Sequence, residues 1–456
     1  MTIAEALADF IVRQPTSNIL SRMRVYALDT LTVALAGTVS ASSEAATRAV
    51  LSACGKPVAT VLGVGRVTSA WDAALVNGTS AHALELDDDH RIAVLHPGAV
   101  VVPAAFAACE AASASGRTFL KSVLVGYEVM CRVGEVFRGS QFYHGVHPTA
   151  LCGVFGAAAA ASAAMSLDRD ATVRALGIAG TQASGLTEWR TDGSWIKRLH
   201  PGRAAQSGVL SARLAAEGFT GPATIFEGSG GFFNAFSYGE KIHPECMTQD
   251  LGTEYKALGT ALKPYPCCRF EHGAIDLALA ARTKVADVSQ IDSVLVKIFR
   301  TDVLTYHSVP KNAVDAQFNV PYAVAVALHA GVVGLSDFTE TAIRRPEILE
   351  LAKRIRVVED PDFSAKYPEK YFTELEVTQK SGTSRLLSDC PSGDPEAPPY
   401  RSDPNLLRRE AEARSARLLA ECGFPNTAGP LAEAVDQLED SPNLDRLSAV
   451  LSTRAS

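Results

Sequence analysis

The chain has 456 residues, 47% of them hydrophobic and 20% charged, a composition typical of a globular protein with two or three domains. Its net charge of −7 argues against nucleic acid or an anionic membrane as the main partner, so an anionic substrate would need a locally basic pocket. Early acidic residues, no signal-peptide core and no apolar run of membrane-spanning length predict a cytoplasmic protein.

The first 260 residues have the periodicity of alanine-rich helices, and one short strand is expected at 58–63. Residues 156–165 are small on every side of their predicted helix, which indicates that this helix packs among others. The helices are predicted at about 2–13, 19–37, 42–54, 68–84, 98–114, 117–137, 148–165, 169–185 and 201–217.

After about residue 265, predicted strands at 294–299, 355–358 and 372–378 interleave with helices at about 269–283, 314–331 and 346–354. The segment 392–399 is rich in turn formers and predicts a linker, and a helical tail at 403–452 is expected to pack back onto the helical part. The sequence therefore predicts a mainly α fold. Its all-helical domain spans 1–265 and is completed by 400–456, and a smaller α+β domain spans 266–399.

Four of the ten histidines stand directly before a proline: His96-Pro97, His147-Pro148, His200-Pro201 and His243-Pro244. The first three each precede a predicted helix, whose first position tolerates proline. A helix N-terminus attracts anions and favours the neutral form of a nearby histidine. Three such starts meeting at one place would bind a small carboxylate or phosphate, whereas each pair alone is an ordinary helix boundary.

The stretch 83–91 concentrates four carboxylates shortly before His96. We expect Asp88 and Asp89 to orient a histidine or a substrate hydroxyl, because the ligand spacing of a hard-cation site is absent. The alternatives are a solvated loop, or a metal hydrolase built on Asp87, Asp88 and His96. Nine scattered cysteines without zinc spacing argue against disulfides, structural zinc and iron–sulfur clusters.

His147 is the better placed histidine of its segment, since a neutral imidazole at a helix start can exchange a proton with substrate near pH 7. Four basic residues precede the next helix and form the strongest local anion site: Lys197, Arg198, His200 and Arg203.

Two prolines stiffen the segment 263–272 and hold three candidate groups near a domain junction: Lys263, Arg269 and His272. Tyr322, at the start of a further helix, offers a phenolic donor, although a tyrosine there could equally be core.

Together, these segments resemble the MmgE/PrpD family, which includes 2-methylcitrate dehydratase, cis-aconitate decarboxylase and iminodisuccinate epimerase. The resemblance covers nearly the whole chain in order. It rests on the acidic stretch 85–89 with His96-Pro97, His147-Pro148, Lys197-Arg-Leu-His200, Lys263-Pro-Tyr-Pro266 with Cys268-Arg269, and Gln317-Phe-x-x-Pro-Tyr322. It implies a large helical domain with a smaller α+β lid domain, a homodimer, and catalysis without metal or organic cofactor.

Carried over by position, the resemblance places Glu85, His96, His147, Lys197, Lys263 and Tyr322 in the pocket. Catalytic roles are expected for His96, His147, Lys197, Lys263 and Tyr322. Substrate binding is expected for Glu85, Asp88, Asp89, Arg198, His200, Arg269 and His272. Glu85 stands where decarboxylase and epimerase members carry aspartate. Asp89 and His90 stand where decarboxylases carry threonine and tryptophan, and these departures favour no named member.

The chemistry that the resemblance implies is proton movement at a carbon next to a carboxylate, with Lys197, Lys263 and Arg269 stabilising the charge that develops. His147 is expected to be the base or acid, with His96 or Tyr322 opposite. The leading expectation is a cofactor-independent lyase on a small di- or tricarboxylate such as 2-methylcitrate or cis-aconitate. An epimerase or isomerase on a similar substrate and a non-catalytic helical binding protein remain alternatives.

Overall fold

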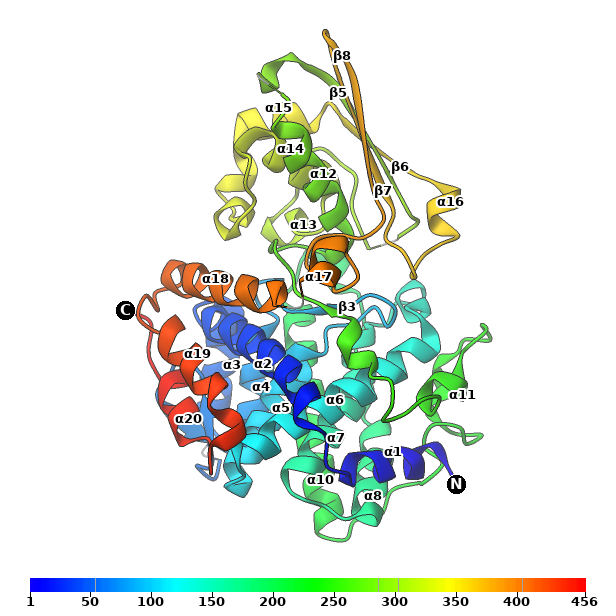
Figure 1. Ribbon diagram of the computed structural model, residues 1–456, viewed down its shortest axis with the longest axis vertical. Helices are drawn as coiled ribbons and strands as arrows, with labels where there is room; N and C mark the ends of the chain where they lie inside the picture. Colours follow the sequence, from blue (N-terminus) through cyan, green and yellow to red (C-terminus); the bar gives the residue numbers. More distant parts are fainter. Residues whose placement is uncertain (54, 286, 302, 404) are drawn as a thin grey trace. The chain divides into compact units, whose positions relative to one another are not determined.

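A computed structural model describes residues 1–456 apart from 54, 286, 302 and 404 and the side chain of Ser17. The described chain is mainly α, as predicted, and divides into two compact units. The helical unit comprises 1–187, 195–262 and 404–456, and the α+β unit comprises 188–194 and 263–403 (Figure 1).

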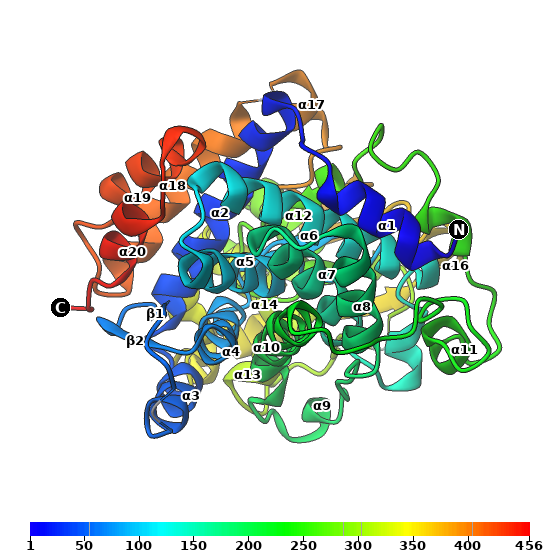
Figure 2. The same ribbon diagram turned by 90° about the horizontal axis from the view of Figure 1, so that it is seen from below.

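The helical unit is built from alanine-rich helices that bury most of their surface. Its long helices begin and end as follows: α1 Ile3–Val12, α2 Ser17–Gly37, α3 Ala41–Leu51, α4 Ala70–Ala81, α5 Gly98–Ala112, α6 Gly116–Phe137, α7 Pro148–Ala164, α8 Arg169–Gly180 and α10 Ile196–Ala216. Every residue of α7 is buried, as its small side chains predict. Helices α5, α6, α8 and α10 surround α7 (Figure 2).

Two pairs of helices cross so closely that only glycine fits at the contact. A Cβ on Gly126 of α6 would lie 2.9 Å from the carbonyl oxygen of Gly156 in α7. A Cβ on Gly202 of α10 would lie 2.1 Å from the carbonyl oxygen of Leu75 in α4, and Gly78 faces Gly202. The second crossing brings the end of α4 beside the beginning of α10, which is where the candidate site lies.

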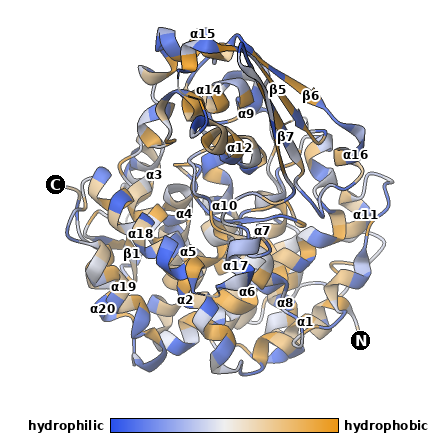
Figure 3. Ribbon diagram, turned by 45° about the horizontal axis from the view of Figure 1, so that its top comes forward, coloured by the Kyte–Doolittle hydropathy of each residue, from blue (hydrophilic) through white to orange (hydrophobic). Residues whose placement is uncertain are grey.

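The tail returns to the helical unit as three helices, α18 Leu406–Glu421, α19 Ala428–Asp436 and α20 Asp445–Leu451. Hydrophobic and hydrophilic residues alternate along them, as expected for helices with one packed side (Figure 3). Helices α18 and α19 pack on α2, and a buried ion pair joins Arg414 of α18 to Asp29 of α2.

Two short antiparallel ribbons complete this unit. Strand β1 (Ala59–Val61) pairs with β2 (Arg66–Thr68), and β3 (Asp89–His90) pairs with β4 (Thr260–Ala261). The second ribbon fixes the acidic stretch that follows α4, because Asp89 lies opposite Ala261.

The α+β unit holds a four-stranded sheet of order β6-β5-β7-β8. Its strands are β5 Ile291–Ile298, β6 Ile355–Glu359, β7 Thr373–Gln379 and β8 Gly382–Ser388. Strand β6 is parallel to β5, and the other pairs are antiparallel. Its helices of seven or more residues are α12 His272–Arg282, α14 Val320–Ala330 and α15 Pro346–Ala352, and the short helices α9 Trp189–Asp192, α13 Ala313–Ala316, α16 Pro361–Ser364 and α17 Pro398–Ser402 accompany them.

The predicted elements differ from the structure in several places. The helix expected from Pro201 begins earlier, at Ile196, so His200-Pro201 is not a helix start. The helix expected at 314–331 is split into α13 and α14, because Asn319 caps a new helix by accepting from the backbone of Tyr322. Strands β2, β3, β4 and β8 were not predicted. The predicted helix end at 54, residues 286 and 302 of the expected α+β domain and residue 404 of the tail lie outside the described residues.

Within the described residues, no single helix is long and apolar enough to cross a membrane. One bent pair, Asn18–Gly37 with Ala41–Leu51, passes that test by length and composition only. The eight described cysteines are free thiols, and most are buried.

Candidate active site in the helical unit

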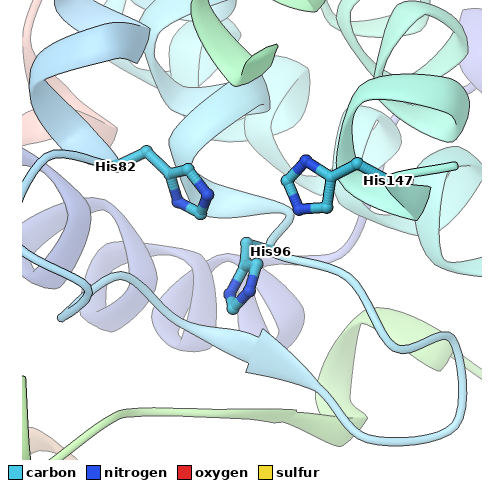
Figure 4. Close-up of side chains that lie close together, drawn as sticks. All are labelled: His82, His96 and His147. Carbon is cyan, nitrogen blue, oxygen red and sulfur yellow. The ribbon is translucent and has the colours of Figure 1, made fainter. Parts of the chain in front are cut away.

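Three histidines from separate segments of the helical unit lie together (Figure 4). His82 directly follows α4, His96 lies before α5, and His147 caps the start of α7. Each offers a ring nitrogen within 4.8 Å of those of the other two, and the ring centroid of His82 lies 5.0 Å from that of His96 and 5.7 Å from that of His147. We call these three side chains the histidine cluster.

Lys197, in the first turn of α10, is held against the histidine cluster by two partners. Its Nζ donates to Oε1 of Glu85 at 2.5 Å and to Nε2 of His82 at 3.0 Å. An ammonium only donates, so the proton of neutral His82 is on Nδ1, which donates to Oδ2 of Asp87 at 2.6 Å. Burial lowers the pKa of His82, although the charge of Asp87 opposes this. The four buried groups thus fix one tautomer of His82.

In the turn after α4, Glu85 adopts a strained backbone conformation that brings its carboxylate to Lys197. Glu85 has a φ of 55°, in the left-handed region, where a residue with a Cβ costs roughly 1–2 kcal/mol. The strain is offset by the ion pair that its carboxylate makes with Lys197. A left-handed non-glycine residue beside catalytic-type side chains is typical of a functional turn.

Asp88 fixes the loop that carries His96. Its carboxylate accepts from the backbone N–H of Gly98 at 2.8 Å and from the hydroxyl of Tyr127 at 2.7 Å. Its carbonyl oxygen accepts from Nδ1 of His96 at 2.7 Å. Burial raises the pKa of Asp88 to about 7, against the lowering effect of its two hydrogen bonds. Both carboxylate oxygens are used inside the protein, which gives Asp88 a positioning role, and substrate binding by Asp88 stays a prediction.

The contact with Asp88 also determines how His96 presents its ring. A carbonyl oxygen only accepts, so Nδ1 of His96 carries the proton and Nε2 of the neutral ring presents its lone pair. Its backbone N–H donates to the hydroxyl of Thr149 in α7 at 3.1 Å. With 12% of its side chain exposed, His96 is the most accessible member of the histidine cluster.

His147 begins α7 as the sequence predicts, and it is paired with His200. The two Nδ1 atoms lie 3.0 Å apart, so one ring donates and the other accepts. Nε2 of His147 is buried and has no hydrogen-bond partner among the described residues. Burial, together with the charges of His200 and Lys197, holds the pKa of His147 well below its usual range. Burial likewise lowers the pKa of His200 to about 4.

His200 reaches this position because α10 begins before Pro201. Lys197 and His200 are three residues apart on one face of the helix, and both are buried. Pro201 therefore stands inside the second turn, where its missing N–H removes one helical hydrogen bond. The expectation that His200-Pro201 opens a helix is wrong. Of the four basic side chains predicted there, Lys197 and His200 lie at the site, whereas Arg203 is exposed and donates to Gln206.

Two other predicted residues of this unit, Asp89 and Arg198, lie near His96 and Ser42. Asp89 belongs to β3, and its Oδ1 lies 3.9 Å from Nδ1 of His96. Arg198 points to the hydroxyl of Ser42 at 3.5 Å, and burial lowers the pKa of its guanidinium. Substrate binding by Asp89 and Arg198 stays a prediction.

The remaining predicted residues belong to the α+β unit. Arg269 donates to the carbonyl oxygens of Ser392 at 2.6 Å and Pro391 at 3.2 Å, and to Nδ1 of His272 at 3.1 Å. Burial and the charge of Arg269 hold the pKa of His272 well below its usual range. These contacts tie the segment before α12 to the segment after β8.

Lys263 and Tyr322 are also buried in the α+β unit. The hydroxyl of Tyr322 donates to the carbonyl oxygen of Asp337 at 2.5 Å, and burial raises its pKa. Catalytic roles for Lys263 and Tyr322 stay predictions.

Sequence reasoning missed His82 and underrated Asp87. His82 is not followed by proline and ends a helix, so the pattern that drew attention to the other histidines passes over it. The spacing of five residues between His82 and Asp87 is the only local signal. Their hydrogen bond depends on the turn at Glu85, which no sequence pattern predicts.

The arrangement can move protons and stabilise negative charge. His96 presents a lone pair, the His147–His200 pair can pass a proton along its Nδ1–Nδ1 contact, and Lys197 supplies a fixed positive charge. These are the components of acid–base chemistry on a small anion.

Comparison with known proteins identifies the family. The MmgE/PrpD N-terminal domain matches residues 1–245, and the MmgE/PrpD C-terminal domain matches residues 265–405. The chain is 31% identical to the cis-aconitate decarboxylase-like protein oryM of Aspergillus oryzae over 370 residues. The aligned region covers 76% of this chain and 77% of that protein.

Two further relatives are similar over most of their length. The cis-aconitate decarboxylase of Aspergillus terreus is 30% identical over 370 residues, which is 76% of this chain and 75% of that protein. The cis-aconitate decarboxylase of Mus musculus is 27% identical over 395 residues, which is 83% of this chain and 78% of that protein. The chain therefore belongs to the MmgE/PrpD family and is an enzyme of the lyase type.

Proposed function

We propose that this lyase decarboxylates a small unsaturated tricarboxylate, with cis-aconitate as the first candidate, at the histidine cluster and Lys197. The observation that carries the proposal is the convergence of a fixed ammonium with imidazoles in one buried volume. The decarboxylase names of the relatives support the choice of substrate class.

The reaction needs one proton and a place for negative charge. In cis-aconitate, the bond to the carboxylate on the saturated carbon breaks, and its electron pair forms a new double bond. The original double bond shifts its pair to the carbon next to another carboxylate, and that carbon takes a proton. One proton is consumed, CO2 leaves, and the product is an unsaturated dicarboxylate.

Lys197 is the group that stabilises the charge of the intermediate. The electron pair delocalises onto the adjacent carboxylate, where an ammonium in a dry environment is worth far more than in water. Glu85 and His82 hold Nζ of Lys197 in place, so little reorganisation is needed when the charge develops.

His147 is the proton donor of the proposal. When Nδ1 of His200 donates to Nδ1 of His147, the proton of His147 is on Nε2, on the side of the histidine cluster. His200 fixes this tautomer, and as Nε2 of His147 gives up its proton the Nδ1 proton of His200 passes to Nδ1 of His147, with a proton from solvent restoring His200. His96, with its lone pair at Nε2, would accept a proton instead, which is what a dehydratase or an epimerase requires.

Proton NMR in D2O tests the proposal on a panel of cis-aconitate, citrate, 2-methylcitrate and iminodisuccinate. Decarboxylation predicts a new pair of terminal-alkene signals from cis-aconitate, with one deuterium on the saturated carbon of the product. Alkene signals from citrate or 2-methylcitrate without CO2 would instead establish a dehydratase. Deuterium exchange without net conversion would establish an epimerase, and either result would replace the proposal.

A matched pair of variants tests whether His147 takes part in the reaction. His147→Gln should lose turnover by at least a hundredfold, because the donor is gone. His144→Gln, an exposed histidine paired with Glu240, should keep the rate of the unmodified protein. Equal activity in both variants would remove His147 from the mechanism.

A further inference from the structure

We propose that the histidine cluster is also a binding site for a divalent transition-metal ion of the zinc type, which excludes substrate from the same volume. His82, His96 and His147 each offer a ring nitrogen within 4.8 Å of the other two. Imidazole nitrogen is a preferred ligand of Zn²⁺, and three histidines with an open fourth position form a known kind of zinc site.

Two of the three rings are already oriented as in metal sites. A ligating histidine usually donates its other ring N–H to a carboxylate or a carbonyl oxygen. His82 donates from Nδ1 to the carboxylate of Asp87 at 2.6 Å, and His96 donates from Nδ1 to the carbonyl oxygen of Asp88 at 2.7 Å. In both rings Nε2 is therefore the nitrogen that could bind a metal.

The third ring, that of His147, has a buried nitrogen that a bound metal ion could engage. Nε2 of His147 is buried and has no hydrogen-bond partner among the described residues, although a buried polar atom normally has one. A tetrahedral zinc with Zn–N distances of about 2.0–2.1 Å holds its nitrogens roughly 3.3 Å apart. The ring nitrogens, which lie within 4.8 Å of one another, would have to approach by up to about 1.5 Å for such a site to form.

The ammonium of Lys197 opposes metal binding, so replacing Lys197 should raise the affinity for zinc. Its Nζ lies 3.0 Å from Nε2 of His82 and 2.5 Å from Oε1 of Glu85, so a metal ion on Nε2 of His82 must break the first contact and displace the ammonium. Replacing Lys197 by an uncharged residue removes this competition and leaves the carboxylates of Glu85 and Asp87 nearby. Such a variant loses the charge that the proposed catalysis needs while it gains affinity for the metal.

The test is a direct titration of the metal-free full chain with Zn²⁺ against a colorimetric chelator, without any substrate. We expect one strong site per chain, and at least tenfold weaker binding in His96→Ala, whose side chain is the most accessible of the three. His144→Ala, at an exposed histidine that is paired with Glu240, should bind like the unmodified protein. Lys197→Met should bind at least tenfold more tightly, and the rise in its melting temperature with Zn²⁺ reports this even if the variant is less stable.

Absence of a site tighter than about 0.1 mM, or equal affinity in His96→Ala and His144→Ala, would overturn the proposal. That zinc competes with substrate rests on the proposed function, whereas zinc binding itself does not. An enzyme inactive on every carboxylate of the panel that still binds one Zn²⁺ through His96 would separate the two claims.

Discussion

At the scale of single residues, the site depends on groups whose hydrogen bonds orient its histidines. Asp87 fixes the tautomer of His82, Asp88 fixes that of His96, and His200 pairs with His147. A neutral histidine has one donor and one acceptor nitrogen, so each partner decides what the other nitrogen presents. Removing one of them should alter the chemistry without emptying the site.

Asp87→Asn tests this most simply. The asparagine amide can donate to Nδ1 of His82, which moves the ring proton to Nε2 and turns it against the ammonium of Lys197. We expect kcat to fall by about 10²–10⁴-fold, as in other carboxylate–histidine pairs, with a smaller change in KM. Steady-state kinetics beside a melting curve measures both, and near-normal kcat would contradict the positioning role.

Asp88→Asn should change how stability depends on pH. The pKa of Asp88 is about 7 in the folded protein against an ordinary 3.8, so between pH 4 and 7 the unfolded chain ionises this group while the folded chain keeps it protonated. Stability is therefore lost as pH rises through this window, at up to about 1.4 kcal/mol per pH unit.

An asparagine at position 88 cannot ionise. Its side-chain amide can still accept from the N–H of Gly98 and form a hydrogen bond with the hydroxyl of Tyr127. Its stability relative to the unmodified protein should rise from pH 4 to pH 7 in denaturant titrations. A constant difference across that range would show that Asp88 does not titrate in this window.

At the scale of elements, the crossing of α4 and α10 sets the site. A Cβ on Gly202 would meet backbone atoms of α4, so Gly202→Ala must push the helices apart. We expect a loss of about 1–3 kcal/mol of stability. Turnover should also fall, because His82 directly follows α4 and Lys197 belongs to α10, so moving the helices apart separates these two side chains.

The matched control is Gly429→Ala in α19, where the added Cβ has nothing within 4 Å. Alanine is the better helix former, so this variant should stay within about 1 kcal/mol of the unmodified protein or gain stability. Equal melting temperatures for the two variants would contradict the close-crossing account.

Most helices could be predicted from the sequence, because long runs of small residues end at recognisable turn formers. The predicted starts of α5 and α7 at His-Pro pairs agree with the structure to within a residue or two. The start of α10 could not be predicted, since the burial of Lys197 and His200 outweighs the preference of proline for a first turn. Strand β8 has little alternation and is mostly exposed, so its pairing with β7 alone defines it.

The candidate site was predictable only in part. The sequence predicts His96, His147 and Lys197 as site residues, and the family resemblance adds Glu85. These four side chains lie together in the helical unit. His82 was missed because its role depends on the left-handed turn at Glu85. Pattern reasoning identifies residue types near helix ends, but it does not determine which side chains a strained turn brings into contact.

At the scale of the whole chain, the tail packs back onto the N-terminal part of the helical unit, including β1 and α5. Glu110, near the end of α5, accepts from the hydroxyl of Ser448 in α20 at 2.6 Å, and from the N–H and hydroxyl of Thr60 in β1 at 2.7 and 2.6 Å. One carboxylate thus joins three segments that are distant in sequence.

Glu110→Ala should therefore destabilise the helical unit more than Ser448→Ala. The first variant leaves three donors without their acceptor, at about 1–3 kcal/mol for each that stays buried, whereas the second removes one hydrogen bond worth about 1 kcal/mol. Denaturant unfolding of the two variants measures the difference. A smaller effect for Glu110→Ala would show that the tail is held by packing alone.

In the proposed reaction, Lys197 stabilises the charge formed when a carboxylate substrate loses CO2. The most direct measurement is the initial rate of CO2 release from cis-aconitate by the unmodified protein, Lys197→Met and Arg213→Met, the last an exposed residue of the same helix paired with Glu217. We predict release by the unmodified protein and Arg213→Met, and a loss of at least 10²-fold in Lys197→Met. No release by the unmodified protein, or equal rates in all three, would contradict the claim.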